Sequence, residues 1–184
     1  IRAARGAKYI DRVVVSTDDD GIATAAKAEG AEVVWRPSQI SGDTSSSESA
    51  LLHALKKLAK TQGYMPELLV FMQCTSPLTL PEDVDAAVEA LRRENADTVF
   101  SAAPFHGFVW RIGAGGEAIG VNHNMRLRLR RQDREEEYVE NGAIYVMKVA
   151  GFLIHKHRFF GRTVISVMPV ERTLDIDEPA DLER

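Results

Sequence analysis

Residues 68–102 read LLVFMQCTSPLTLPEDVDAAVEALRRENADTVFSA, a helical pattern between two apolar runs. The runs Leu68–Gln73 and Thr98–Ala102 are almost continuously apolar, which is typical of strands that are covered on both faces. Between them, Pro81–Arg93 carries apolar residues at helical spacing, and Pro81 falls in the first turn, where its missing N–H costs little. The stretch therefore predicts a strand–helix–strand unit of an α/β fold.

The same alternation continues on both sides of this unit. Strands are predicted at Arg12–Thr17, Ala31–Trp35, Ala143–Met147 and Thr163–Met168, and helices at Asp20–Glu29 and Ser45–Lys60. Ser45 and Glu48 have the spacing of a capping box, and Gly30 is expected to end the first of these helices near a C′ position. Alternating strands and helices predict a three-layer α/β fold with a mostly parallel sheet.

Residues 104–141 interrupt this alternation. Trp110–Ile112 and Ala118–Val121 flank a glycine-rich turn and predict a hairpin, and a polar segment rich in Arg and Glu follows. We interpret the stretch as an insertion that projects from the sheet and forms a dimer contact or a lid. With this insertion included, residues 1–184 are expected to form a single domain.

Composition excludes several classes of protein. The 184 residues are 45% hydrophobic and 27% charged, which is ordinary for a globular domain with a sizeable core. A formal net charge of -4 argues against a nucleic-acid binder, because there is no basic surplus to neutralise phosphates. No apolar run approaches the ~18 residues of a membrane span, and a single cysteine offers neither a disulfide nor a zinc site. We therefore expect a cytoplasmic protein.

Polar residues follow the predicted strands, where the ligands of open α/β sheets bind. Ser16–Asp19 follow the first strand, although the simpler interpretation is that Asp18 or Asp19 caps the next helix. Arg36 follows the second strand, and the hydroxyl-rich loop Gly42–Ser47 leads into a helix N-terminus. Backbone N–H groups and an arginine there suit an anion such as a phosphate. A well-capped surface helix is the alternative.

Two carboxylates near the C-terminus have the spacing of a cation site. In an extended segment Asp175 and Asp177 share a face, so both can approach one hard cation. Magnesium prefers one or two carboxylates together with substrate phosphates. The alternative is that Asp177, which precedes Glu178 and Pro179, caps a helix. Gln73, at the end of a buried strand, needs a hydrogen-bond partner, which slightly favours a ligand over a structural role.

Together these segments resemble the CMP-N-acylneuraminate cytidylyltransferases, also called CMP-sialic acid synthetases. The matching segments are Val14–Asp19, Arg36-Pro37, Asp43–Ser46, Gln73–Leu78, Arg131-Gln132, Glu140–Tyr145 and Asp175–Asp177. Each is weak alone, but their order and spacing are specific and cover the chain from about Ile10 to Leu182. The resemblance implies a Rossmann-like nucleotidyltransferase fold with an inserted dimerisation subdomain, and hence a homodimer.

The resemblance implies roles for residues around the nucleotide. Arg36, Asp43 and Ser47 would lie around the cytidine nucleotide. Asp175 and Asp177 would hold magnesium against the phosphates of CTP, and they are the two residues with an implied catalytic role.

The resemblance also implies a sugar pocket. Gln73 would touch the acyl-amino side of the sugar, and Tyr145 together with Asn141 would help to line the pocket. Arg131 matches an arginine that family members reach across a dimer to the sugar site. The family also begins with a strand and a phosphate-binding loop, whereas this chain opens at Ile1 inside a predicted helix. We therefore expect a domain that is incomplete at its N-terminus and inactive on its own.

The implied activity is the magnesium-dependent transfer of CMP from CTP to the anomeric hydroxyl of a sialic-acid-type nonulosonic acid, with release of pyrophosphate. The expected partners are CTP and the sugar acid, with neither nucleic acid nor membrane. One alternative is a related nucleotidyltransferase that acts on another sugar, such as an octulosonic acid or a sugar phosphate. The more distant alternative is a non-catalytic nucleotide-binding or dimerisation module.

Overall fold

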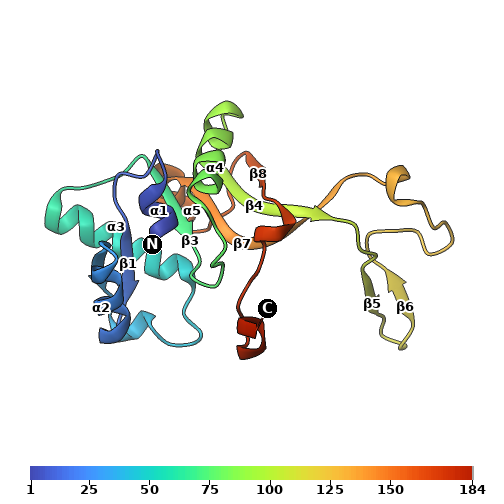
Figure 1. The fold of residues 1–184 in the computed structure, drawn as a ribbon, viewed down its shortest axis with the longest axis horizontal. Coiled ribbons are helices and arrows are strands. Elements are labelled where there is room, and N and C mark those ends of the chain that lie inside the picture. Colours follow the sequence, from blue (N-terminus) through green and yellow to red (C-terminus); the bar gives the residue numbers. More distant parts are fainter. Residues whose placement is uncertain (184) are drawn as a thin grey trace.

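The computed structural model describes residues 1–183, whose arrangement is shown in Figure 1. The helices are α1 (Arg2–Gly6), α2 (Asp20–Ala28), α3 (Ser47–Gln62), α4 (Pro81–Arg93) and α5 (Val149–His155). The strands are β1 (Val14–Thr17), β2 (Glu32–Trp35), β3 (Leu68–Met72), β4 (Thr98–Phe105), β5 (Trp110–Ile112), β6 (Ala118–Gly120), β7 (Glu137–Lys148) and β8 (Thr163–Val167). Short 3-10 helices cover Ser38–Ile40, Arg131–Asp133, Val170–Arg172 and Pro179–Glu183. None of the described helices has the length and apolar character needed to cross a membrane.

The main sheet is mixed. Its strand order is β3-β7-β4-β8, with β7 antiparallel to both β3 and β4, and with β4 and β8 parallel. The predicted α/β class is confirmed, and three of the four strands, β3, β4 and β8, run in one direction while β7 runs against them. The reason is that the chain leaves the sheet at the end of β4 and returns at the same edge, so β7 runs back beside β4 as in a long hairpin.

β1 and β2 form a separate parallel pair that α2 connects. Val14–Thr17 lie in register with Glu32–Trp35. Among the described strands, no sheet hydrogen bond joins β1 to β3. The two parts are held together by α3, which contacts β1 and packs Leu51 and Leu55 against the main sheet.

Helices cover the two faces of the main sheet and form two cores. On one face, α4 packs Val84 and Val88 against β4 and β7. On the other face, α3 and α5 contribute Leu55 and Phe152. Successive residues of β7 alternate between the two faces, and Tyr145 belongs to the second core. The predicted three layers are confirmed, because helices pack against both faces of the sheet.

The N-terminus of α3 differs from the prediction. Ser46 is the N-cap, and its hydroxyl accepts a hydrogen bond from the Ser49 N–H at 3.2 Å. The predicted capping box of Ser45 and Glu48 is wrong, because Glu48 Oε1 instead accepts a hydrogen bond from Arg158 Nε at 2.7 Å. A charge-assisted hydrogen bond is stronger than one to a neutral backbone N–H. The carboxylate of Glu48 therefore bonds to the guanidinium of Arg158 rather than to the backbone at the start of the helix.

Residues 106–136 leave the sheet as an arm, which projects to the right in Figure 1. β4 and β7 stay paired as far as Phe105 and Glu137, so a two-stranded ribbon carries the arm. The strands thus extend into the stretch 104–141 that the sequence assigned to the insertion. The predicted hairpin is confirmed as β5 paired with β6. Large exposed apolar side chains on the arm include Trp110, Ile112, Val121, Met125 and Leu127.

Candidate active site

The candidate site lies along one edge of the main sheet, where β3, β4 and β8 end. Because β7 runs the opposite way, its N-terminal half, with Asn141 and Gly142, lies beside these carboxyl ends. The Gln73 N–H, just after β3, donates to the Ala143 carbonyl at 3.3 Å. In Figure 1 the loops that follow β2 and β3 and the C-terminal segment all lie on the lower side of the molecule. This is the edge at which open α/β sheets bind ligands.

Gln73 and Asp175 converge on Gly142. Gly142 has a φ of 72°, which glycine adopts without steric cost. A Cβ at this position would lie 2.8 Å from Gln73 Oε1 and 3.8 Å from Asp175 Oδ2. The Ile176 N–H donates to the Thr75 carbonyl at 2.8 Å, so the segment that carries Asp175 lies against the loop after β3. The fold thus brings together two residues that were predicted from separate motifs.

The two C-terminal carboxylates lie in different environments. Asp175 is half-buried, and its Oδ1 is enclosed without a hydrogen-bond partner in the part of the chain that the structure describes. Asp177 is exposed, and the carboxylate of Asp181 accepts hydrogen bonds from the N–H groups of Asp177 and Glu178 at 3.2 and 3.1 Å. Asp181 thus reaches back to the backbone N–H groups that precede the last 3-10 helix. A magnesium role for Asp175 and Asp177 stays a prediction.

Arg36 lies across the ends of β1 and β2. Its Nη2 donates to the Ser16 carbonyl at 2.6 Å. Arg36 Nε and Ser16 Oγ are both buried without a partner among residues 1–183. Asp43 is exposed in the loop that leads to α3, and Ser47 is the first residue of that helix. A guanidinium and the free N–H groups of a helix N-terminus suit a nucleotide or its phosphates.

Asn141 lies in the interior beneath this edge, with 9% of its surface exposed. Its Oδ1 accepts hydrogen bonds from Ser101 Oγ at 2.6 Å and from the Ala143 N–H at 3.3 Å. Its Nδ2 lies 3.4 Å from Met168 Sδ. The amide therefore shapes the bend of the chain at Gly142, and a direct contact between Asn141 and a sugar stays a prediction.

Tyr145 is the centre of an aromatic cluster on the face covered by α3 and α5. Its ring stacks on Phe71 with 5.7 Å between centroids and meets Phe159 edge-on at 6.1 Å. Its hydroxyl donates to the exposed carboxylate of Glu140. Burial, and then the hydrogen bond to Glu140, raise the pKa of Tyr145 to about 12. The phenol therefore stays protonated at neutral pH and acts as a hydrogen-bond donor.

Two charged residues of this cluster were missed by sequence reasoning. The guanidinium of Arg158 lies 4.6 Å from the centroid of Tyr145 and 5.2 Å from that of Phe71. Its partner Glu48 comes from α3, and the two side chains are only 17% and 15% exposed. A pair 110 residues apart leaves no local signal in the sequence, and the spacing of Glu48 indicated a helix cap.

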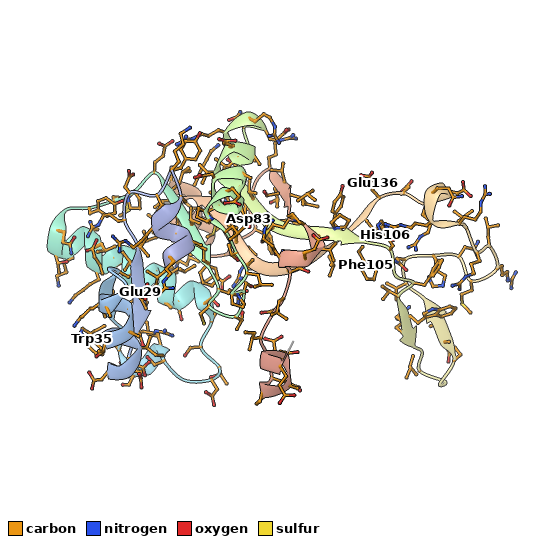
Figure 2. The ribbon with its side chains drawn as sticks, in the orientation of Figure 1. Glu29, Trp35, Asp83, Phe105, His106 and Glu136 are labelled. Carbon is orange, nitrogen blue, oxygen red and sulfur yellow. The ribbon has the colours of Figure 1, made fainter. Side chains whose placement is uncertain are left out.

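Arg131 is exposed on the arm and does not join the other candidates within one chain. It lines a hollow of about 320 Å³ together with His106, Gln132, Arg134 and Glu136. Figure 2 labels His106 and Glu136 at the start of the arm, well to the right of Asp83 in the body of the molecule. A contact between Arg131 and the sugar site stays a prediction.

Comparison with known proteins gives a consistent result. The model of a family described as cytidylyltransferase matches residues 1–164. N-acylneuraminate cytidylyltransferase A of Danio rerio is 34% identical and the N-acylneuraminate cytidylyltransferase of Oncorhynchus mykiss is 32% identical, each over 98% of this chain. The chain spans 41% of the length of each of these relatives.

A solved structure supports the same fold. A structure of CMP:2-keto-3-deoxy-manno-octonic acid synthetase complexed with CTP superposes with a TM-score of 0.65 at 15% identity, covering 98% of this chain and 81% of that one. At this identity the likeness concerns the fold alone, and it confirms the predicted nucleotidyltransferase fold class.

Proposed function

Because the chain belongs to the cytidylyltransferase family, we propose that it carries the site that transfers CMP from CTP to the anomeric hydroxyl of a sialic-acid-type nonulosonic acid, releasing pyrophosphate. The resemblance to N-acylneuraminate cytidylyltransferases is confirmed, and the names of these relatives support the sugar class. The partners of the proposed reaction are CTP and the sugar acid.

One observation carries the proposal most directly. At the carboxyl edge of the sheet, Asp175 has a buried oxygen without a partner among the described residues, and it lies beside Gln73 at the bend of Gly142. Buried polar atoms are almost always hydrogen-bonded, so an orphaned carboxylate oxygen at a ligand-binding edge indicates a missing ligand or cation. A carboxylate beside a side-chain amide suits a site that holds phosphates and a substituted sugar.

The residues of the chain would act mainly by positioning the two substrates. Phosphoryl transfer needs the attacking hydroxyl in line with the leaving group, and orientation supplies much of its acceleration. Arg36 and the N-terminus of α3 at Ser47 would bind the nucleotide and neutralise phosphate charge, with Asp43 beside them. Gln73 would orient the sugar. Tyr145 would not serve as a base, because its raised pKa of about 12 keeps it protonated. Its proton is donated to Glu140, so its oxygen would accept a hydrogen bond from the sugar.

Asp175 and Asp177 fit a magnesium ion that is shared with the phosphates of CTP. The orphaned Oδ1 of Asp175 and the exposed carboxylate of Asp177 supply the one or two carboxylates that this ion prefers. When bound, magnesium would neutralise the charge that develops as pyrophosphate leaves.

We also propose a homodimer in which the arm of one chain brings Arg131 to the sugar pocket of the other. The forked guanidinium of an arginine suits the carboxylate of a sugar acid. The arm exposes apolar side chains, with Ile112 83% exposed and Leu127 58% exposed, and an apolar surface of this kind supports a contact with another protein.

The proposal is tested by measuring pyrophosphate release from CTP and magnesium with a purified full-length protein that contains residues 1–184. The panel of acceptors contains N-acetylneuraminate, an octulosonic acid, a sugar phosphate and a blank. We expect release only with N-acetylneuraminate. Release only with another acceptor would favour the related transferase, and binding of CTP without any release would favour the non-catalytic module.

A further inference from the structure

We infer that Arg158 is a positioning residue of the proposed sugar pocket: held by Glu48, it fixes the ring and the hydroxyl of Tyr145. The inference rests on the proposed function, in which Tyr145 lines that pocket. None of the segments that carry the family resemblance contains either charged residue, and their role follows from the contacts of the folded chain.

The ion pair is enclosed and therefore has a defined geometry. Arg158 Nε lies 2.7 Å from Glu48 Oε1, and the side chains are 17% and 15% exposed. Removing charges from water is costly, so an enclosed guanidinium is tolerated only where a partner satisfies it. Glu48 is itself fixed, because it belongs to the first turn of α3, where a carboxylate also interacts favourably with the helix dipole.

The guanidinium covers a pair of stacked rings. Phe71 of β3 and Tyr145 of β7 occupy paired positions in the sheet, and their planes differ by 22°. Arg158 lies 5.2 Å from the first centroid and 4.6 Å from the second, within the range of cation–π attraction. Phe159 closes another side of Tyr145 edge-on. The tyrosine ring is thus held by the sheet, by Phe159 and by the cation.

Fixing the ring also fixes the hydroxyl at the edge of the sheet. The Tyr145 hydroxyl donates to Glu140, whose side chain is exposed beside the candidate site. Without the guanidinium, the Phe71–Tyr145 pair would lose its cover and the ring could tilt toward the vacated space. A displacement of about 1 Å is large for a group that must meet a substrate hydroxyl. Arg158 would therefore act on the substrate through Tyr145, without touching it.

The test compares the wild-type protein with Arg158→Met, Glu48→Gln and the double variant. Proteins labelled with meta-fluorotyrosine are examined by fluorine NMR, and the Tyr145 resonance is identified by its loss in Tyr145→Phe. We expect one sharp Tyr145 resonance in the wild type and a broadened or split one in both single variants. Arg162→Met and Glu94→Gln are matched controls from an exposed ion pair, and they should leave the resonance unchanged.

Kinetics provide the second measurement. In Arg158→Met the KM for the sugar should rise about tenfold while the KM for CTP stays the same, because only the sugar side is loosened. The KM of the double variant for the sugar should be no higher than that of Arg158→Met alone, since the effects of substituting residues that act as one unit do not add. A fall in melting temperature without a change in the sugar KM would indicate a merely structural pair and overturn the inference.

The resonance separates failure of this inference from failure of the proposed function. An unchanged Tyr145 resonance in Arg158→Met overturns the positioning role, whatever the activity. If the wild type makes no CMP-sugar, the proposed function fails, and the resonance still decides whether Arg158 holds the ring. Should Arg158→Met not fold, Arg158→Lys keeps the charge but loses the planar fork, and it should broaden the resonance to a smaller extent.

Discussion

At the scale of single residues, the candidate site is marked by polar atoms that the chain leaves unsatisfied. Asp175 Oδ1, Arg36 Nε and Ser16 Oγ are buried without partners among the described residues. The sequence predicted Asp175 and Arg36, because both follow predicted strands. It could not predict Arg158, because its partner and the rings that it covers come from other elements and meet only after folding.

The two C-terminal carboxylates give the first prediction. Asp175→Asn and Asp177→Asn remove charge from the proposed cation site, so turnover at limiting magnesium should fall by about 10²-fold or more. The free energy of unfolding should change little, because neither carboxylate takes part in a cap or an ion pair described above. Steady-state rates and urea unfolding measure the two effects. Wild-type turnover of Asp177→Asn at limiting magnesium would remove that residue from the metal site.

The Glu48–Arg158 pair predicts how stability depends on pH. Burial raises the pKa of Glu48, but the hydrogen bond and the charge of Arg158 outweigh it, so the pKa ends below its ordinary value. Since the folded pKa is lowered, the stabilisation is fully present above the unfolded pKa of about 4.3 and is lost as the pH falls through the folded pKa. Urea unfolding measured from neutral to acidic pH should therefore show that the free energy of unfolding falls less in Glu48→Gln than in the wild type. Equal losses in both proteins would contradict the assignment.

At the scale of elements, local signals predicted α4 at both ends, from Pro81 and a regular apolar stripe to Arg93. Local signals gave the wrong prediction where a residue far away in the sequence determines the structure. α3 begins after Ser46 rather than with a box at Ser45, and Glu48 bonds instead to Arg158 in the loop between α5 and β8. The direction of β7 was also missed, because apolar content reveals a buried strand but not which way its neighbours run.

The cap of α3 gives a prediction at this scale. Ser46→Ala removes the hydroxyl that accepts from the Ser49 N–H and should lower the free energy of unfolding by about 1 kcal/mol. Ser45→Ala is the matched control and should change it by less than about 0.5 kcal/mol, since Ser45 is not the cap. Urea denaturation measures both values. A larger loss for Ser45→Ala would restore the capping box that the sequence indicated.

At the scale of the whole molecule, the arm separates Arg131 from the residues around Gly142. The sequence predicted a projecting insertion because residues 104–141 break the alternation of strands and helices. The arm begins where the pairing of β4 with β7 ends, at Phe105 and Glu137. The paired part of β7 includes polar residues that show no strand pattern in the sequence. Only the folded structure could give that boundary.

The proposed shared site predicts complementation between subunits. A heterodimer of Arg131→Ala and Asp175→Asn chains has one intact site, because the Arg131→Ala chain keeps Asp175 and receives Arg131 from its partner. After random mixing of two inactive variants, activity should recover to roughly a quarter of the wild-type value, since half of the dimers are mixed and each has one working site. Native mass spectrometry verifies that mixed dimers form. Mixed dimers without activity would show that Arg131 does not act across the interface.

The central claim, transfer of CMP to a nonulosonic acid at the edge marked by Gln73 and Asp175, is tested most directly by phosphorus NMR of the reaction itself. A purified full-length protein that contains residues 1–184 is incubated with CTP, magnesium and N-acetylneuraminate, and its Asp175→Asn variant serves as the control. We predict that the triphosphate signals give way to one phosphodiester signal and one pyrophosphate signal, and that both products are nearly absent with the variant. Unchanged CTP signals, or the appearance of CDP and phosphate in place of a phosphodiester, would contradict the account.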